Sequence, residues 1–270
     1  MKKILTPLLL TLSLYGGQPL HWAPHHCDTG NRAASKHGGH GGSEKTMFSL
    51  MNGEKEGVAR LILPDLSTEE LNISHAIVTL PKTQMGGYAA LVVNQRTGTG
   101  VNSAIRYLSL HGRPVKISPT KLTSLPKAVL EIVPAPLHRE HDRYTGSKEY
   151  RFLLTFQGEP LPHTPLILET NNKTSQTYTS DEKGVFAITL PNDFKNVKPG
   201  RSENKPSEFL LTATLKDSGL HYQSTLSMPY YANPNDYWQS QQMGAIAIFF
   251  GFIGGLLIYR RTTSKGVKRG

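Results

Sequence analysis

The chain has 270 residues, of which 19% are charged, with 18 prolines, 25 glycines and one cysteine. This length allows one large or two modest domains, and the single cysteine excludes an intramolecular disulfide. The formal net charge of +10 lies mostly at the two ends, with Lys2 and Lys3 at the start and five basic residues within 260–270. Without these seven, 23 basic residues face 20 acidic ones. The charge therefore indicates membrane topology and gives no sign of a nucleic-acid partner.

The N-terminal residues have the pattern of a secretory signal. Lys2 and Lys3 precede the apolar run Ile4–Tyr15, which Gly16 and Gly17 follow. A charged start, a short apolar stretch and a small-residue exit are typical of a signal peptide, and about a dozen residues are too few to span a bilayer. The sequence predicts a signal peptide over residues 1–17, cleaved between residues 16 and 23, and export from the cytoplasm.

Residues 18–42 are rich in histidine and glycine, and we expect them to be flexible. Imidazole and thiolate are ligands for nickel, cobalt, copper or zinc, and glycines let a backbone wrap an ion. The sequence predicts a multi-ligand transition-metal site here and no organic cofactor. A solvated tether that binds no metal is the alternative, and a Cys27-linked dimer is a third interpretation. The candidate metal ligands are His21, His25, His26, Cys27, His37 and His40, with Asp28 beside the thiol.

Short β-rich runs follow in residues 43–137, separated by clusters of Gly, Pro, Asn and Asp. Spacing of this kind is typical of a sandwich or barrel. We therefore expect an N-terminal β domain over residues 43–137. The predicted strands are Val58–Leu63, Ile73–Leu80, Tyr88–Val93, Ala104–Leu110 and Ala128–Val133.

Residues 138–149 are polar and follow a proline-rich stretch, which predicts a linker. His138 and His141, with Asp142 beside them, have a spacing that can bind zinc-like ions if the segment is folded. They form a possible second metal site. A solvated loop is the favoured alternative.

Residues 150–232 contain six further predicted strands within about eighty residues, the pattern of a small immunoglobulin-like sandwich. Ser180–Gly184 and Asp217–Gly219 are predicted turns, and the carboxylates of Asp181 and Glu182 are explained by turn chemistry. The strands are Tyr150–Phe156, Leu166–Glu169, Thr174–Thr179, Val185–Leu190, Phe209–Leu215 and Tyr222–Met228.

A family resemblance covers residues 126–230. It is carried by LEIVPAPL (130–137), YRFLLTFQGEPLPHTPLILET (150–170) and TSDEKGVFAITLP (179–191). In this order they resemble the periplasmic proteins associated with energy-coupling-factor nickel and cobalt transporters, with their carboxypeptidase-regulatory-like sandwich domain. The resemblance implies a periplasmic accessory role in nickel or cobalt uptake. The long Gly/His-rich stretch near the N-terminus departs from the family pattern.

Residues 243–259 contain no charged residue and predict one transmembrane helix. Tyr237, Trp238 and Tyr259 flank the helix as interfacial aromatics, and the basic residues after it predict a cytoplasmic tail over 260–270. The small residues Ala247, Gly251 and Gly255 recur every four positions, so they would form a ridge where another membrane helix can approach.

These features predict a mainly β protein of two β domains, the second an immunoglobulin-like sandwich, with a single C-terminal transmembrane helix. No hydrolase elbow, phosphate-binding loop, dinucleotide fingerprint or zincin motif is present in the sequence, so we expect no enzyme and no catalytic residue. The predicted function is a periplasmic accessory protein, anchored in the inner membrane, that binds nickel or cobalt and presents it to a transmembrane transporter subunit. The alternative is a structural or protein-interaction module of the envelope, with a His-rich tether.

Overall fold

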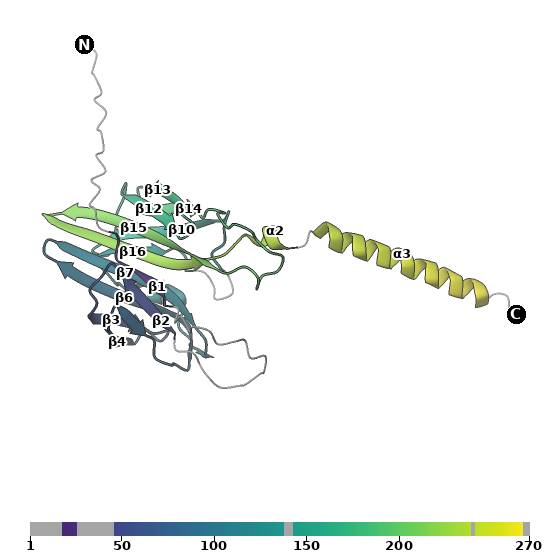
Figure 1. Cartoon of the computed structure of the whole chain (residues 1–270), viewed down its shortest axis with the longest axis horizontal. Helices are drawn as coiled ribbons and strands as arrows, with labels where there is room; N and C mark the ends of the chain where they lie inside the picture. The colour runs from purple at the N-terminus through teal and green to yellow at the C-terminus, as the bar shows by residue number, and fades with distance from the viewer. Residues whose placement is uncertain (1–17, 26–45, 138–142, 239–240, 267–270) are drawn as a thin grey trace, which may run out of the picture.

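The computed structural model of this chain describes residues 18–25, 46–137, 143–238 and 241–266 (Figure 1). The predicted signal peptide lies outside the described residues, as do residues 26–45 of the His-rich region and 138–142 of the predicted linker. The described chain is mainly β, as predicted.

The first β domain consists of two facing sheets. One is formed by β1 (His21–Pro24), β2 (Met47–Met51) and β5 (Ile77–Thr79) in the order β1-β2-β5. The other is formed by β3 (Gly57–Ile62), β4 (Thr68–Ile73), β6 (Met85–Thr97) and β7 (Gly100–Leu110), in the order β4-β3-β6-β7. A two-residue strand, β8 (Arg113–Pro114), pairs with β6, and the short helix α1 (Pro119–Ser124) follows.

The second domain repeats this arrangement. β10 lies between β9 and β14, with the short β11 beside β10, and the facing sheet has the order β13-β12-β15-β16. The two antiparallel sheets enclose one core, which confirms the predicted immunoglobulin-like sandwich. The strands are β9 (Leu130–Pro134), β10 (Glu149–Phe156), β11 (Glu159–Pro160), β12 (Pro165–Thr170), β13 (Ser175–Thr179), β14 (Val185–Thr189), β15 (Ser207–Asp217) and β16 (Leu220–Tyr230).

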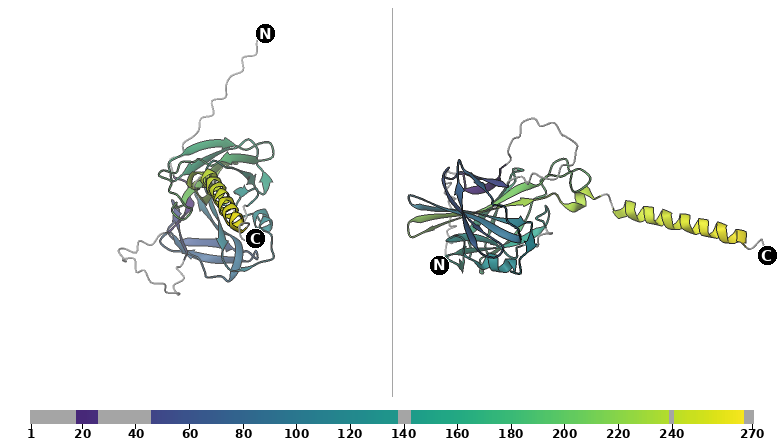
Figure 2. Two further views of the ribbon diagram at one scale, coloured as in Figure 1. Left: turned by 90° about the vertical axis from the view of Figure 1, so that its right-hand side faces the viewer. Right: turned by 90° about the horizontal axis from the view of Figure 1, so that it is seen from below.

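The two domains are joined by their last strands, β7 and β16, which pair in parallel with Ala104 opposite Thr225. The joined sheet has the order β4-β3-β6-β7-β16-β15-β12-β13. Read from either end, it presents the fourth, third, sixth and seventh strands of a domain, if the two-residue strands β8 and β11 are not counted. Because β7 and β16 pair in parallel, a rotation about an axis along these strands relates one domain to the other. Such a rotation turns the sheet over, so the inner face of one domain continues as the outer face of the other. The small sheets β1-β2-β5 and β9-β10-β14 therefore cover opposite faces of the joined sheet (Figure 2).

Strand β6 of the joined sheet is buried on both faces. Ala89, Leu91 and Val93 belong to the core beneath β1-β2-β5, whereas Ala90 and Val92 belong to the core of the second sandwich. Successive side chains of a strand point to opposite faces, so an unbroken apolar run is the pattern of a strand covered on both sides. The joined sheet is thus the middle layer of three.

Residues 18–25, predicted to be flexible, are instead an ordered part of the first domain. Trp22 in β1 is completely buried, and Leu20 is buried beside it. The indole Nε1–H of Trp22 donates to the carbonyl oxygen of Ala104 at 3.2 Å. The prediction of flexibility was wrong here because a four-residue strand with alternating burial gives almost no periodic signal.

Two further expectations need correction. The predicted strand Ile73–Leu80 is broken by His75 and Ala76, whose φ angles of 53° and 61° are left-handed, so β4 and β5 belong to different sheets. The described part of the predicted linker is also not a solvated loop, because Tyr144 is buried in the second core, with its ring 4.7 Å from that of Tyr150. The low strand propensity of this segment therefore did not mean that its side chains are exposed to solvent.

The C-terminal part begins with a helical turn, α2 (Pro234–Tyr237), and continues as the long helix α3 (Gln241–Gly266). The window Gly244–Arg261, which ends with two arginines, is long and apolar enough to cross a membrane, and none of it is buried against the described protein (Figure 1). The predicted C-terminal apolar helix is therefore confirmed.

Candidate functional site

The two histidine-containing segments occupy equivalent places in the duplicated fold. Residues 26–45 connect β1 to β2, and residues 138–142 lie in the connection from β9 to β10. These are the first and second strands of each domain. Their candidate ligands all lie outside the described residues: His26, Cys27, His37 and His40 in the first segment, and His138, His141 and Asp142 in the second.

Backbone pairing joins the strands that precede and follow each segment. The backbone N–H of His25 donates to the carbonyl oxygen of Met47 at 3.0 Å, directly after the β1–β2 ladder. In the second domain, the N–H of Ala135 donates to the carbonyl oxygen of Arg151 at 2.9 Å. The residues that flank the first segment, His25 and Met47, are therefore held next to each other.

The two β domains together, β1 to β16, are called the β body. The described residues next to both segments lie at the end of the β body from which α3 leaves. In the second domain, the N–H of Tyr231, just after β16, donates to the carbonyl oxygen of Tyr144 at 2.9 Å. In the first domain, β1 runs beside β16 and in the same direction. The hydroxyl of Thr225 donates to the carbonyl oxygen of Leu20 at 2.6 Å, and Ser227, further along β16, lines a cavity together with Trp22 and Ala23. The His25 end of β1 therefore points to the α3 side of the molecule.

His21 and His25 are the predicted ligands that the structure describes. Four residues along a strand separate their Cα atoms by roughly 13 Å, so the two rings are not brought to one ion. His25 Nδ1 lies 2.8 Å from the hydroxyl of Ser49, and His21 Nδ1 lies 2.9 Å from the carbonyl oxygen of Pro19. Such contacts orient an imidazole and leave Nε2 to coordinate. Within the described ranges no three His, Cys, Asp or Glu side chains are grouped to hold a metal.

His21 instead lines a separate cavity of about 240 Å³ between β1, β12 and β15. Glu169 and Glu208 also line it. The structure thus assigns His21 and His25 to different surroundings, and only His25 adjoins the 26–45 segment.

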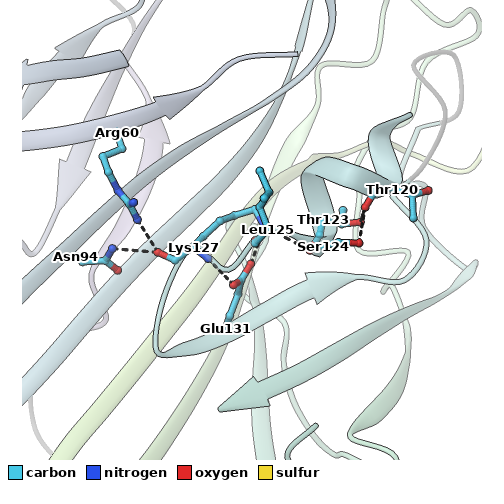
Figure 3. Close-up of polar contacts among 8 residues, drawn as sticks. All are labelled: Arg60, Asn94, Thr120, Thr123, Ser124, Leu125, Lys127 and Glu131. Carbon is cyan, nitrogen blue, oxygen red and sulfur yellow. Dashed lines mark hydrogen bonds and ion pairs between the residues drawn. The ribbon is translucent and has the colours of Figure 1, made fainter. Parts of the chain in front are cut away.

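A buried ion pair that sequence reasoning missed joins Lys127, before β9, to Glu131 in β9, and the Lys127 carbonyl oxygen binds two strands of the joined sheet (Figure 3). Lys127 Nζ donates to Glu131 Oε1 at 2.9 Å and to the carbonyl oxygen of Leu125 at 2.6 Å. The carbonyl oxygen of Lys127 accepts from Arg60 Nη2 at 2.9 Å and from Asn94 Nδ2 at 3.1 Å. Burial lowers the pKa of Lys127, and the neighbouring Glu131 carboxylate partly opposes this. The Lys127 ammonium group is hydrogen-bonded to other groups of the protein, so we assign it a structural role.

A second polar cluster surrounds Asp193, beyond the end of β14. Its Oδ1 accepts from the Tyr230 hydroxyl at 2.5 Å, and its Oδ2 accepts from the hydroxyls of Thr170 and Thr174, each at 2.7 Å. Asn172 Nδ2 donates to Oδ1 at 3.1 Å. Burial raises the pKa of Asp193, but the four hydrogen bonds outweigh it and the pKa is lowered; burial and the carboxylate together raise the pKa of Tyr230 to about 12. The cluster fastens the β12–β13 turn to the end of β16.

The Asp181 turn behaves as the sequence predicts. Asp181 Oδ1 accepts backbone N–H groups from Lys183 and Val185, both at 2.8 Å. Gly184 follows with a left-handed φ of 72°. The Asp181 carboxylate therefore stabilises the turn between β13 and β14.

The predicted ridge of Ala247, Gly251 and Gly255 lies within the continuous helix α3. A Cβ atom added at either glycine would meet no atom of the described protein within 4 Å. The helical spacing places the three residues on one face. A helix partner for that face stays a prediction.

No known protein-family model matches the chain, and no curated protein matches it. Among solved structures, a 1.5-MDa bacterial ice-binding adhesin is similar over 70% of this chain and 57% of its own, with 11% identity and a TM-score of 0.26. The D0-D1 domains of intimin are similar over 69% of this chain and 91% of theirs, with 13% identity and a TM-score of 0.23. The D00-D0 domain of intimin is similar over 69% of this chain and 92% of its own, with 11% identity and a TM-score of 0.23. Superpositions this loose say nothing about a shared function.

Proposed function

We propose that this protein is a non-enzymatic, membrane-anchored accessory protein that captures a transition-metal ion, nickel or cobalt, and presents it to a membrane uptake partner. The β body faces the periplasm, α3 anchors it in the inner membrane, and the basic residues within 260–270 lie in the cytoplasm. The ion binds the 26–45 segment.

One observation carries this proposal: the described residues that flank both histidine-containing segments lie at the end of the β body that continues into α3. An ion held there is close to a membrane-embedded acceptor. His25 supplies one ligand of fixed position, because β1 pairs with β2 and Ser49 orients the ring. Closing the loop by strand pairing also reduces the conformational entropy lost when the ion binds.

Calorimetry with Ni(II) and Co(II) on the full-length chain, purified in detergent without a His-tag, tests this. We expect a Kd near 1 μM, about −8 kcal/mol. Replacing His26, Cys27, His37 and His40 together should weaken binding at least tenfold. A matched control is His111→Asn with His163→Asn, two exposed histidines outside both segments, which should leave the Kd unchanged.

The outcomes separate the two candidate classes. If His138→Asn with His141→Asn abolishes binding and the first set does not, the ion belongs to the second segment. If neither full-length protein nor variants bind either metal, metal capture is wrong and the interaction-module alternative remains. Gly251→Leu with Gly255→Leu should keep the protein in the membrane but reduce co-purification of a transporter subunit.

A further inference from the structure

The membrane-proximal end of the β body carries a cavity of about 650 Å³ lined by basic and aromatic side chains. We refer to it as the juxtamembrane pocket. Three segments form it: residues 143–148 before β10, the loop around residues 201–204, and residues 231–238 after β16. Its volume lies within the range of small-ligand sites.

The pocket is positively charged. Arg143, Lys148 and Arg201 line it, and none of the described lining residues is acidic. The Arg143 guanidinium lies 4.4 Å from the ring centroid of Tyr231, an arrangement that holds the charged group in place. Planar guanidinium groups suit phosphate oxygens because they can donate two parallel hydrogen bonds.

Local contacts order the pocket wall. The backbone N–H of Gly200 donates to the carbonyl oxygen of Tyr237 at 3.2 Å, which joins the loop to α2. Asn204 Nδ2 donates to the carbonyl oxygens of Lys198 and Gly200, both at 2.7 Å, and closes that loop on itself. Asn233 Nδ2 donates to the carbonyl oxygen of Gly146 at 3.2 Å. The three segments are therefore joined to one another by hydrogen bonds.

Chain connectivity fixes where the pocket lies relative to a membrane. Trp238, 60% exposed, lines the pocket, and α3 begins three residues later at Gln241. The apolar window starts at Gly244, so Trp238 is within roughly 15 Å of the hydrocarbon edge. Tyr237 and Trp238 are the aromatic residues expected at the headgroup level. Lipid phosphates lie in that layer.

We propose that the juxtamembrane pocket binds the phosphate headgroup of an anionic phospholipid in the leaflet next to the β body. This rests on α3 spanning the membrane, as proposed above, and not on metal capture. The bound lipid would hold the β body against the bilayer and so restrict the orientation of the two histidine-containing segments.

The test uses the full-length chain in nanodiscs of phosphatidylcholine with and without phosphatidylglycerol. Native mass spectrometry counts the retained lipids, and the quenching of Trp238 by headgroup-labelled lipid reports proximity; Trp238→Phe identifies its part of the signal. We expect retention of phosphatidylglycerol over phosphatidylcholine, reduced roughly tenfold by Arg143→Gln with Arg201→Gln. Lys121→Gln with Lys216→Gln removes two exposed charges elsewhere and should keep the preference.

Three results would overturn the proposal: equal retention of both lipids, an unchanged preference in the pocket variant, or an equal loss in the control variant. Millimolar inorganic phosphate added to phosphatidylglycerol discs should not displace the lipid; if it does, the pocket is a site for free anions. Failure of the chain to enter nanodiscs at all would instead contradict the anchor. Circular dichroism of the pocket variant, with an unchanged melting temperature, shows that it is folded.

Discussion

Arg106 in β7 and Glu208 in β15 form a two-point ion pair across the intervening strand β16. Nη1 donates to Oε2 at 2.5 Å, and Nη2 donates to Oε1 at 3.0 Å. The guanidinium also lies 5.0 Å from the ring centroid of Phe48 in β2. One buried arginine of the first domain is thus paired with a carboxylate of the second, and the contact reinforces the sheet junction.

Replacing Glu208 with Gln should lower the free energy of unfolding by about 3 kcal/mol, because the buried Arg106 would lose its counter-charge. Urea unfolding of the full-length chain in detergent, followed by tryptophan fluorescence, measures this. Glu203→Gln, at an exposed loop position, should change stability by less than about 0.5 kcal/mol. Equal effects of the two substitutions would show that the pair contributes nothing beyond surface charge.

Lys127→Met should cost about 3–5 kcal/mol, since it leaves the Glu131 carboxylate buried without its partner. The double variant Lys127→Met with Glu131→Leu should recover most of this loss, because the uncompensated charge is gone. Melting temperatures of the three proteins decide the point. A double variant as unstable as the single one would mean that packing, and not charge pairing, makes this site important.

Trp22→Ala should destabilise the first domain by about 3–5 kcal/mol, because it empties a fully buried site and removes the bond to Ala104. His25→Ala, directly after the same strand and only half-buried, should cost much less. Urea titration with circular dichroism detection measures both. By the same reasoning, a chain that begins at residue 44 lacks β1 and should be less stable than one that begins at residue 18.

Asp193→Asn should reduce stability at pH 7 by about 2 kcal/mol, because the carboxylate accepts four hydrogen bonds. The folded-state pKa of Asp193 is lowered, so its contribution is present above the unfolded value of about 3.9 and is lost as the pH falls through the lowered folded value. The difference between wild type and variant should therefore shrink at acid pH. Urea unfolding at pH 7 and pH 3 tests the trend, with Asp217→Asn, at the end of β15 and outside this cluster, as control.

Much of the fold was predictable because it depends on local pattern. Alternating or continuous apolar runs correctly located β3, β6 and β7, and the six long strands of the second domain that follow β9. They also located β9, but its pairing with β10 places it in the second domain and not in the predicted N-terminal domain. The candidate site was predictable only as composition. Histidines and a cysteine identify a chemistry, but the pairing of His25 with Met47, which closes the 26–45 loop, depends on contacts between strands.

The sequence by itself determined that this is a mainly β protein with one apolar C-terminal helix, since strand periodicity and a long uncharged run are encoded within neighbouring residues. Only the tertiary structure decided that Ile105 and Leu226, more than a hundred residues apart, meet in a parallel pair. That junction makes one sheet from two domains, exchanges their faces and brings both histidine-containing segments to the same end. Pairing between distant strands is determined by complementary burial on both faces and not by local propensity, so no single segment of the chain specifies it.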